Sequence, residues 1–538
     1  MTDGAAVDYL IVGAGPAGLQ AGYFLQRSGH SYLIVESGAA PGTFFTRFPR
    51  HRKLISINKV HTGWDDPELR LRTDWNSLLS DEGAPLFTDY TPRYFPDADT
   101  MVRYLGDFAA AHRLAVRHST RITEITRPGP PAGTGDFVAR AADGSVFRAR
   151  RLIVATGVSR PYVPDIEGVE TAERYADVSV DPADFTGQRV LIIGRGNSGF
   201  ETADQLIETA AVIHLAGPGS LRLAWQTHFV GHLRAVNNNF LDTYQLKSQN
   251  ALLDGTVQSI RLRPDGSYLV AVSFARVREV VKEIRYDRVI LATGFRFDAS
   301  LFAPECRPRL TIRDRFPEQT DAWESVNVPD LYFAGTLTQQ RDFKKSTSGF
   351  IHGFRYGVRA LHHILRRRYH GVPWPSRELP PTPEAAADAV IARVNRSSAL
   401  WQLFAFMADA LLIGPDGTVR HHEEVPLAHL HRAVADGDFG DVSRYLAVTL
   451  EYGADHDRVN PFDVQVGRVT QSDTSGLDGR YLHPVVRVFD GGSAAGTPVA
   501  EHHLTENLEN EWDSEEVHRA PLLRFLRAHL APATADHR

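Results

Sequence analysis

The chain has little of what several protein classes require. Among its 538 residues, Cys306 is the single cysteine, which excludes a disulfide framework, a zinc site built from cysteines and a CxxC redox pair. The formal net charge of −6 gives no basic footprint for a nucleic-acid partner. The adjacent histidine pairs at 362–363, 421–422 and 502–503 lack the spacing that places two metal ligands on one helix face. We therefore predict no nucleic-acid partner and no metal.

Long hydrophobic runs are also absent. The longest apolar stretch, residues 400–413, is too short and too interrupted to span a bilayer, and we expect a core or interface helix there. The N-terminus leads within a few residues into the first predicted strand, which leaves no room for a signal peptide. These features predict a soluble, cytoplasmic protein that does not bind a membrane.

Two glycine fingerprints stand out in what is present. The first reads GAGPAG over residues 13–18 and follows the apolar run 9–12; the second reads GRGNSG over residues 194–199 and follows the apolar run 190–193. In such a motif the first glycine makes a tight turn, the second lets the backbone approach a pyrophosphate, and the third lets helix and strand pack closely. Two copies predict two bound dinucleotides. The predicted cofactor-binding glycines are Gly13, Gly15, Gly18, Gly194, Gly196 and Gly199.

The residues beyond each fingerprint distinguish the two dinucleotides. Glu36 ends the strand at 31–35, and a carboxylate there suits the ribose hydroxyls of an adenosine, so the first site fits FAD. The strand after the second fingerprint ends without a carboxylate, and Arg222 lies shortly beyond it. Since an arginine there accommodates a 2′-phosphate, NADPH is favoured over NADH. Arg195, inside the second fingerprint, is another candidate for contact with phosphates.

A turn of small residues follows one strand after each of the two fingerprints. Residues 151–157 and 288–294 each form a predicted strand that ends in Ala-Thr-Gly, a turn that lets the chain pass close to a flat cofactor. A later strand ends at Gly335, and a helix-like stretch begins near Gly349. Further predicted cofactor-binding positions are Ala155, Gly157, Gly335 and Gly349.

These patterns predict an α/β fold with two Rossmann-like dinucleotide-binding domains, the second inserted in the first. The FAD-binding domain comprises residues 1–160 and 293–370, and the NAD(P)H-binding domain comprises residues 161–292. A proline-rich linker at 373–383 leads to a mixed C-terminal accessory domain at 384–538. That domain carries no cofactor signature and is a candidate surface for a homodimer.

This architecture resembles that of the superfamily of flavoprotein disulfide reductases and class B flavin monooxygenases. Closer similarity lies in five segments: 47–59, 74–80, 94–97, 241–248 and 349–356. They are similar to the FAD-dependent oxidoreductase domain-containing flavoproteins of the endoplasmic reticulum. They are also similar to bacterial relatives that include amino-acid N-oxygenases, such as the enzymes that form nitrosuccinate from aspartate. The similarity covers about residues 8 to 378.

Two departures from related patterns limit what carries over. The chain lacks the signal peptide and the retention signal of the reticulum members, so their location does not transfer. The Baeyer–Villiger fingerprint, F-x-G-x-x-x-H, has its nearest match at 166–172, where Ala172 stands in place of the histidine. Oxygenation of ketones is therefore disfavoured as the reaction.

The resemblance implies an NADPH- and O2-dependent flavin monooxygenase. Such an enzyme N-oxygenates an amine or a small, aspartate-like amino acid through a flavin C4a-hydroperoxide, in a natural-product pathway. Three alternatives stay open: an FAD and NADPH oxidase or reductase without oxygen insertion, a Baeyer–Villiger-type enzyme, and a non-catalytic FAD-binding partner protein.

The resemblance also suggests catalytic and substrate-binding residues. Asn58 stands where class B monooxygenases carry an asparagine beside the flavin, and Asp74 and Trp75 resemble the Asp-aromatic pair that follows it. His352, near the flavin-facing helix, is a candidate proton carrier. Because a guanidinium suits a carboxylate, we predict that the substrate binds to basic residues near the site. These are Arg47, Arg50, Arg52, Lys53 and Lys247.

Overall fold

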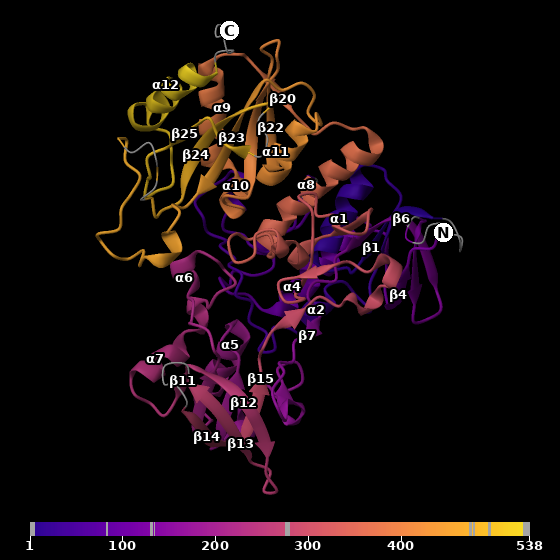
Figure 1. The fold of residues 1–538 in the computed structure, drawn as a ribbon, viewed down its shortest axis with the longest axis vertical. Helices are drawn as coiled ribbons and strands as arrows, with labels where there is room; N and C mark the ends of the chain where they lie inside the picture. The colour runs from indigo at the N-terminus through magenta and orange to yellow at the C-terminus, as the bar shows by residue number, and fades with distance from the viewer. Residues whose placement is uncertain are drawn as a thin grey trace.

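A computed structural model describes residues 6–81, 84–129, 133, 135–274, 280–472, 476, 479–492 and 496–530. The last eight residues of the predicted C-terminal domain, 531–538, therefore lie outside the described residues. Three sheet-based parts are visible in Figure 1: an N-terminal part at the right, a magenta part below and an orange and yellow part above. Within the described ranges, no helix is both long enough and apolar enough to cross a membrane.

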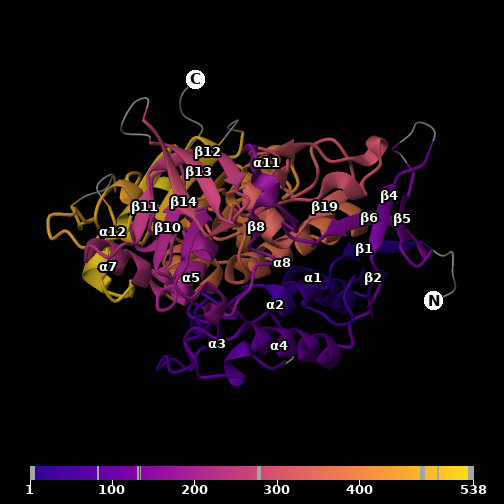
Figure 2. The ribbon, with the colours of Figure 1, turned by 90° about the horizontal axis from the view of Figure 1, so that it is seen from below.

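The first sheet contains the first fingerprint. Its order is β3-β2-β1-β6-β5-β4, and β19 pairs with β6 from a distant part of the chain. The strands β3, β2, β1, β6 and β19 are parallel, whereas β5 and β4 form an antiparallel edge. These strands are β1 (Val7–Val12), β2 (Tyr32–Val35), β3 (Val116–Arg117), β4 (Ile122–Thr126), β5 (Phe137–Ala141), β6 (Val146–Val154) and β19 (Leu331–Phe333). Helices α1 (Pro16–Arg27) and α8 (Ile351–His370) pack together against this sheet (Figure 2).

The second sheet contains the second fingerprint and is wholly parallel, in the order β11-β10-β9-β15-β8. Its strands are β8 (Glu173–Arg174), β9 (Arg189–Ile193), β10 (Val212–Ala216), β11 (Ala251–Leu253) and β15 (Arg288–Leu291). Helix α5 (Asn197–Leu206) follows β9. A three-stranded antiparallel sheet lies between β11 and β15 in the chain and is formed by β12 (Gly255–Leu262), β13 (Tyr268–Phe274) and β14 (Val281–Tyr286).

The chain crosses between the two nucleotide-binding parts twice, and the crossings are adjacent. The outgoing strand β7 (Arg160–Pro161) and the returning strand β16 (Phe295–Arg296) pair antiparallel. The two parallel sheets are therefore joined by a short two-stranded connection, which places the ends of both sheets near one junction (Figure 1).

The C-terminal sheet is wholly antiparallel, in the order β20-β22-β21-β23-β24-β25. Its strands are β20 (Arg377–Leu379), β21 (Met407–Ile413), β22 (Val419–Pro426), β23 (Arg444–Glu451), β24 (His483–Asp490) and β25 (Ala500–His503). Four helices accompany it: α9 (Pro383–Arg396), α10 (Ser398–Gln402), α11 (Leu427–Ala435) and α12 (Ala520–His529).

Two expectations for this region are wrong. The proline-rich stretch 373–383 is not only a linker, because it supplies the edge strand β20. The apolar run 400–413 is a helix only at its start and then becomes strand β21. All seven residues of β21 are buried, so the run shows no alternation of polar and apolar residues, and periodicity cannot distinguish it from a buried helix.

The C-terminal part contacts both nucleotide-binding parts. Arg72, from the first part, donates hydrogen bonds to the carbonyl oxygens of Val394 (2.9 Å) and Ser397 (3.2 Å). On the other side, the ring of His228 stacks on Tyr452 at a centroid distance of 4.0 Å. The C-terminal part is therefore anchored to both nucleotide-binding parts.

Candidate cofactor and active site

The two fingerprints occupy equivalent places in their sheets. Each lies where the order of parallel strands reverses, which is where nucleotides bind in open α/β sheets. Gly13, with φ of +106°, lies so close to the end of β6 that a Cβ atom would be 2.8 Å from the carbonyl oxygen of Ala155. Gly194, with φ of +126°, would bring a Cβ within 2.2 Å of the carbonyl oxygen of Ala292. Both turns therefore require glycine for backbone conformation and for space.

The second and third glycines differ in what surrounds them. A Cβ on Gly15 or on Gly196, the residues that cap α1 and α5, would meet no protein atom within 4 Å. A Cβ on Gly18 would lie 1.9 Å from the carbonyl oxygen of Gly13. Close packing therefore explains the third glycine, and open space at a helix N-terminus explains the second. That space is suited to a pyrophosphate.

Two of the remaining predicted flavin-site residues contact the first turn or helix α1. Glu36 is 5% exposed, and its carboxylate accepts hydrogen bonds from the backbone amides of Ala14 (2.8 Å) and Gly38 (2.7 Å). Gly335 follows β19 with φ of +74°, and a Cβ there would lie 2.7 Å from that of Ala17. Gly349 packs against Gln339, and Gly157 lies just beyond β6 with φ of +64°. Glu36 and Gly335, from segments far apart in the chain, therefore meet at the first turn and the start of α1.

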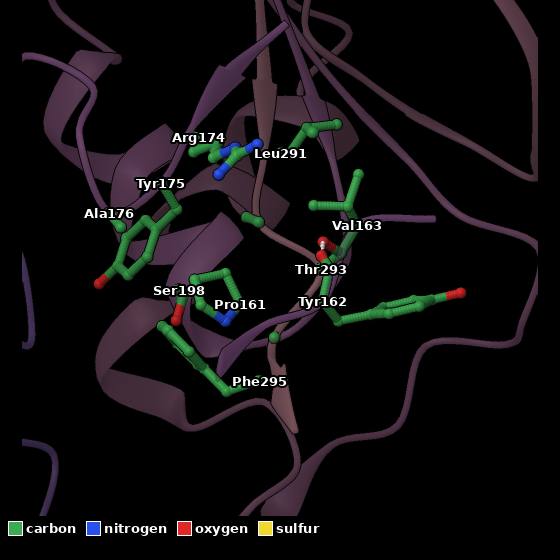
Figure 3. A pocket seen from close by; sticks show the side chains of 12 residues that line it. Pro161, Tyr162, Val163, Arg174, Tyr175, Ala176, Ser198, Leu291, Thr293 and Phe295 are labelled. Atoms are coloured by element: carbon green, nitrogen blue, oxygen red, sulfur yellow. Dashed lines mark hydrogen bonds between the residues drawn. The ribbon is translucent and has the colours of Figure 1, made fainter. Parts of the chain in front are cut away.

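A cavity lies at the second turn. It is small and partly open to solvent, with an enclosed volume of only about 20 Å³. Ser198 of the second fingerprint and Tyr175 line it opposite Thr293 and Val163 (Figure 3). The cavity lies at the ends of β8 and β15 and beside the connection between the two parts, so it is suited to the nicotinamide half of a dinucleotide whose pyrophosphate lies at Gly196.

The structure separates the two candidates for a 2′-phosphate contact. Arg222 has a side chain that is 55% exposed and pairs with Asp457 of the C-terminal part at 3.1 Å. Arg195 is only 8% exposed and pairs with Asp254 at 2.8 Å. Its side chain lies over Gly217, directly after β10, and its Nη2 atom is enclosed without a hydrogen-bond partner. Because the adenosine ribose lies at the end of this strand in the fold, Arg195 is the better placed of the two.

We predict that Arg195→Gln reduces the preference for NADPH over NADH by about tenfold or more, because a charge-assisted contact with a phosphate is lost. The matched change Arg222→Gln is expected to alter this preference less than about twofold. The measurement is the anaerobic rate of reduction of the bound flavin by each nucleotide. A large effect of Arg222→Gln with none for Arg195→Gln would reverse the assignment.

Two hydrogen bonds fix the side chain of Asn58, and its other polar atom has no partner. Its side chain is 1% exposed, and Nδ2 donates hydrogen bonds to the carbonyl oxygens of Thr91 (2.8 Å) and Arg93 (3.2 Å). The Oδ1 atom is enclosed and has no partner. A buried acceptor without a partner is uncommon, and here it is available to a bound group.

Asp74 has a different role from the one predicted. Its Oδ1 accepts from the backbone amides of Asn76 and Ser77, each at 3.0 Å, and its Oδ2 accepts from the Ser77 hydroxyl. Asp74 also forms an isolated β-bridge with Asn58. Since the carboxylate is occupied within its own turn, Asp74 positions Asn58 and Trp75 and is not a free proton carrier.

His352 lies against Trp75, with ring centroids 4.2 Å apart and planes 24° apart. It is 2% exposed, and its Nε2 has no hydrogen-bond partner. Burial, helped by Arg355 and Arg234, lowers the pKa of His352 well below its ordinary value. His352 is therefore neutral, and it can exchange a hydrogen bond with a bound group but does not supply a proton as an imidazolium.

Arg234 was missed by the sequence analysis. It belongs to the second part, yet its guanidinium lies over the Trp75 ring at 5.2 Å and its Nη1 donates to the carbonyl oxygen of Ile55 at 2.8 Å. Asn197 of the second fingerprint holds its loop, because Asn197 Oδ1 accepts from the Arg234 amide at 3.0 Å and Nδ2 donates to the carbonyl oxygen of His232 at 2.8 Å. No local pattern in the sequence predicts the contact of Arg234 with Trp75, since this contact depends on how the two parts pack together.

Each of the three predicted substrate-binding arginines bonds to the protein itself, although Nε of Arg50 and Nη1 of Arg52 are enclosed without a partner. Arg47 pairs with Asp177, and Arg52 pairs with Asp99 at 2.6 Å. Arg50 donates to the carbonyl oxygen of Val178 at 2.7 Å. These contacts anchor the segment 47–52 to neighbouring segments. This anchoring accounts for the basic residues of the segment better than binding of a substrate does.

The two predicted lysines are not drawn into the site. Lys53 is exposed and forms a β-bridge with Asp97. Lys247 is exposed in the turn after helix α7 (Asn239–Gln245), with φ of +61°. The structure thus gathers Asn58, Trp75 and His352 but leaves the predicted basic residues outside that group.

Comparison with known proteins agrees with a fold that has two nucleotide-binding parts. Residues 10–335 match the family model described as pyridine nucleotide-disulphide oxidoreductase. FAD-dependent oxidoreductase domain-containing protein 2 of Mus musculus is 39% identical, and the match covers 96% of this chain and 83% of the mouse protein.

Two solved structures share the fold. The flavin-containing monooxygenase from Stenotrophomonas maltophilia is 22% identical with a TM-score of 0.52, and the match covers 68% of this chain and 99% of that one. The ornithine N-hydroxylase of Kutzneria sp. 744 is 17% identical with a TM-score of 0.50, over 68% of this chain and 100% of that one. The expected pair of cofactors, FAD and NAD(P)H, is confirmed at the level of the family. The chain belongs to the pyridine nucleotide-disulphide oxidoreductase family of FAD- and NAD(P)H-dependent flavoproteins and is a homologue of FAD-dependent oxidoreductase domain-containing protein 2.

Proposed function

We propose that the protein is an NADPH- and O2-dependent flavin monooxygenase that N-oxygenates an amine or a small, aspartate-like amino acid. One observation carries the proposal. Where Arg234 of the second part lies over Trp75 of the first, the neighbouring described side chains are a neutral histidine, His352, and aromatic rings, and not a redox-active thiol. The family includes flavin monooxygenases as well as disulfide reductases, and this group of residues favours the former.

The single cysteine supports this choice. Cys306 ends the short helix η6 (Pro304–Cys306), is fully buried and donates a hydrogen bond to the carbonyl oxygen of Ile125 at 3.3 Å. Burial raises the pKa of its thiol to about 11, so little thiolate exists at neutral pH. A chain with one protected thiol has no pair of cysteines to exchange with a disulfide substrate.

The flavin supplies the redox chemistry when bound, accepting hydride from NADPH and activating O2. The protein positions the bound groups and excludes water from them. Gly15 and Glu36 would hold the flavin nucleotide, and Gly196 with the pocket at Ser198 would hold the nicotinamide nucleotide. Aromatic rings exclude water from the junction, since Phe229 and Phe350 pack with centroids 5.8 Å apart beside the Trp75–His352 stack.

The neutral His352 suits a nucleophilic amine. An amine must present its lone pair to be oxygenated, and Nε2 of a neutral imidazole is able to accept a hydrogen bond from the amine N–H. A protonated histidine could not accept this hydrogen bond, and its positive charge would repel an ammonium group. The unpaired Oδ1 of Asn58 offers a second fixed acceptor at the junction.

Asn58→Ala tests the site. We expect this variant to retain FAD and to oxidise NADPH, while the fraction of electrons that reaches the organic product falls about tenfold or more, because one fixed hydrogen bond is lost. The rest appears as hydrogen peroxide. The measurement compares NADPH consumed with peroxide released. Asn460→Ala, at an exposed asparagine, serves as the control, and full coupling in Asn58→Ala would remove Asn58 from the mechanism.

A further inference from the structure

Tyr175 belongs to the second nucleotide-binding part, but its side chain contacts the first part as well. Its hydroxyl oxygen accepts a hydrogen bond from the backbone amide of Arg50 at 3.1 Å. Its ring stacks on Phe48, with centroids 5.9 Å apart and planes 19° apart. The same hydroxyl group donates to Glu201 of helix α5 at 3.0 Å. Tyr175 therefore joins segment 48–50 of the FAD-binding part to the helix that follows the second fingerprint.

The hydrogen bond between Tyr175 and Glu201 is shielded from solvent. The two residues are 6% and 8% exposed. Burial raises the pKa of Glu201 to about 7, whereas Tyr175, the backbone of His51 and the ammonium group of Lys53 act in the opposite direction. Glu201 thus faces groups from both nucleotide-binding parts. Because hydrogen bonds are stronger where water is excluded, these contacts favour the one arrangement of the two parts in which all of them form.

The covalent connection between the two parts is short. Its strands β7 and β16 pair over only two residues each, so contacts between the parts help to set their relative position. Arg50 Nη2 donates to the carbonyl oxygen of Val178 at 2.7 Å, and Arg47 Nη2 donates to that of Ala176 at 3.1 Å. Together with the contacts of Tyr175, these bonds connect segment 47–50 to residues 175–178, directly after β8.

Tyr175 also lines the cavity at the second turn, together with Ser198 (Figure 3). It is thus placed between the predicted nicotinamide site and the FAD-binding part. Hydride transfer requires the reacting atoms to approach within about 3–3.5 Å, and a displacement of about 1 Å costs about 100-fold in rate. A contact that fixes the cavity against the FAD-binding part therefore acts on the rate of hydride transfer more than on the affinity for the nucleotide.

We propose that Tyr175 and Glu201 are positioning residues for reduction of the flavin, because together they hold the nicotinamide-binding cavity against segment 48–50 of the FAD-binding part. Glu201 acts through the hydroxyl group of Tyr175, and Tyr175 acts through the backbone amide of Arg50 and the ring of Phe48. The assignment rests on the part of the proposed function in which NADPH reduces the flavin, and it is independent of the oxygenation that follows.

The experiment is anaerobic rapid mixing of the FAD-loaded protein with a series of NADPH concentrations, which separates the limiting rate of flavin reduction from the Kd for NADPH. Tyr175→Phe keeps the ring against Phe48 and the wall of the cavity but removes both hydrogen bonds of the hydroxyl group. We expect the limiting rate to fall about tenfold or more, while the Kd stays within about threefold. The long-wavelength absorbance that arises when NADP+ stacks on reduced flavin should decrease in the same variant.

Tyr268→Phe is the matched control. The hydroxyl group of Tyr268 donates to the carbonyl oxygen of Thr171 at 2.8 Å, so the control removes a similar hydrogen bond that lies wholly within the second part. It should leave both the limiting rate and the Kd for NADPH unchanged.

Two variants of Glu201 test the pair. Glu201→Gln keeps a carbonyl oxygen that accepts from the Tyr175 hydroxyl group and should retain the limiting rate within about threefold. Glu201→Ala removes this acceptor and should lower the rate as Tyr175→Phe does. In the double variant Tyr175→Phe/Glu201→Ala the loss should not exceed the larger single loss, because both changes remove the same interaction. If flavin absorbance shows that Tyr175→Phe does not fold, the two Glu201 variants carry the test.

Three results would overturn the assignment. They are a limiting rate in Tyr175→Phe equal to that of the wild-type protein, a loss expressed in the Kd for NADPH alone, and equal losses in Tyr175→Phe and Tyr268→Phe. A wild-type flavin that NADPH does not reduce would overturn the proposed function together with this assignment. Because oxygen is absent throughout, failure of N-oxygenation would leave the result unaffected.

Discussion

Replacement of Gly15 by alanine is expected to give a folded protein that no longer retains FAD. The added methyl group meets no protein atom within 4 Å, and Gly15 has φ of −74° and ψ of −178°, which alanine adopts without strain. The methyl group would, however, occupy the space through which the backbone approaches the pyrophosphate. We expect the Kd for FAD to rise by about 100-fold or more, because contacts with the phosphates at the start of α1 are lost.

The measurement is flavin absorbance per polypeptide after gel filtration, together with the melting temperature of the apoprotein. Gly106→Ala is the matched control. Gly106 lies within helix α4 (Ala98–Ala111), and its Cβ would also meet no neighbour. That variant should bind FAD normally and be slightly more stable. A yellow Gly15→Ala protein with unchanged flavin content would contradict the position assigned to the FAD pyrophosphate.

Replacement of Arg393 by alanine is expected to lower the free energy of unfolding by about 3–5 kcal/mol, because it leaves the buried carboxylate of Asp409 without its arginine. Arg393 is 8% exposed, and its Nε donates to Asp409, itself 1% exposed, at 2.5 Å. Nη1 lies 3.3 Å from Glu68 of the first part, and Nη2 lies 3.7 Å from Glu424 of β22. The side chain therefore ties α9 and the C-terminal sheet to the FAD-binding part.

Denaturant unfolding of the FAD-loaded protein measures this effect. Arg527→Ala removes a pair with Glu384 of α9 in which the arginine side chain is 58% exposed, away from the Arg393 cluster. It should cost no more than about 1 kcal/mol. Equal stability of the two variants would show that the Arg393 cluster does not hold the C-terminal part in place.

Local patterns were sufficient for the nucleotide-binding turns. A strand, a glycine-rich turn and a helix are adjacent in the chain, so the requirement for Gly13 and Gly194 is visible in the sequence and is then explained by the carbonyl oxygens of Ala155 and Ala292. The same holds for Glu36, which follows β2 directly. Each of these features depends on residues within one βαβ unit.

The pairing of the basic residues could not be predicted in this way. The basic run at 47–53 looked suited to a carboxylate, but a sequence does not show that Asp99 and Asp177 already neutralise two of its arginines. Arg234 belongs to no recognisable local pattern in the sequence, because the residue that it contacts, Trp75, is distant in the chain. The strand β21 was mistaken for a helix for a related reason, since burial on both faces removes the periodicity that identifies a strand.

The central proposal is most directly tested by supplying isotopically labelled O2 to the NADPH-reduced holoenzyme in the presence of carboxylated amines, beginning with L-aspartate. Product mass and hydrogen peroxide are measured in the same sample. We predict that oxygen from O2 appears on the nitrogen of the product and that peroxide accounts for only a minor share of the NADPH consumed. Peroxide equal to the NADPH consumed, with no label in any amine offered, would contradict monooxygenation and favour an oxidase.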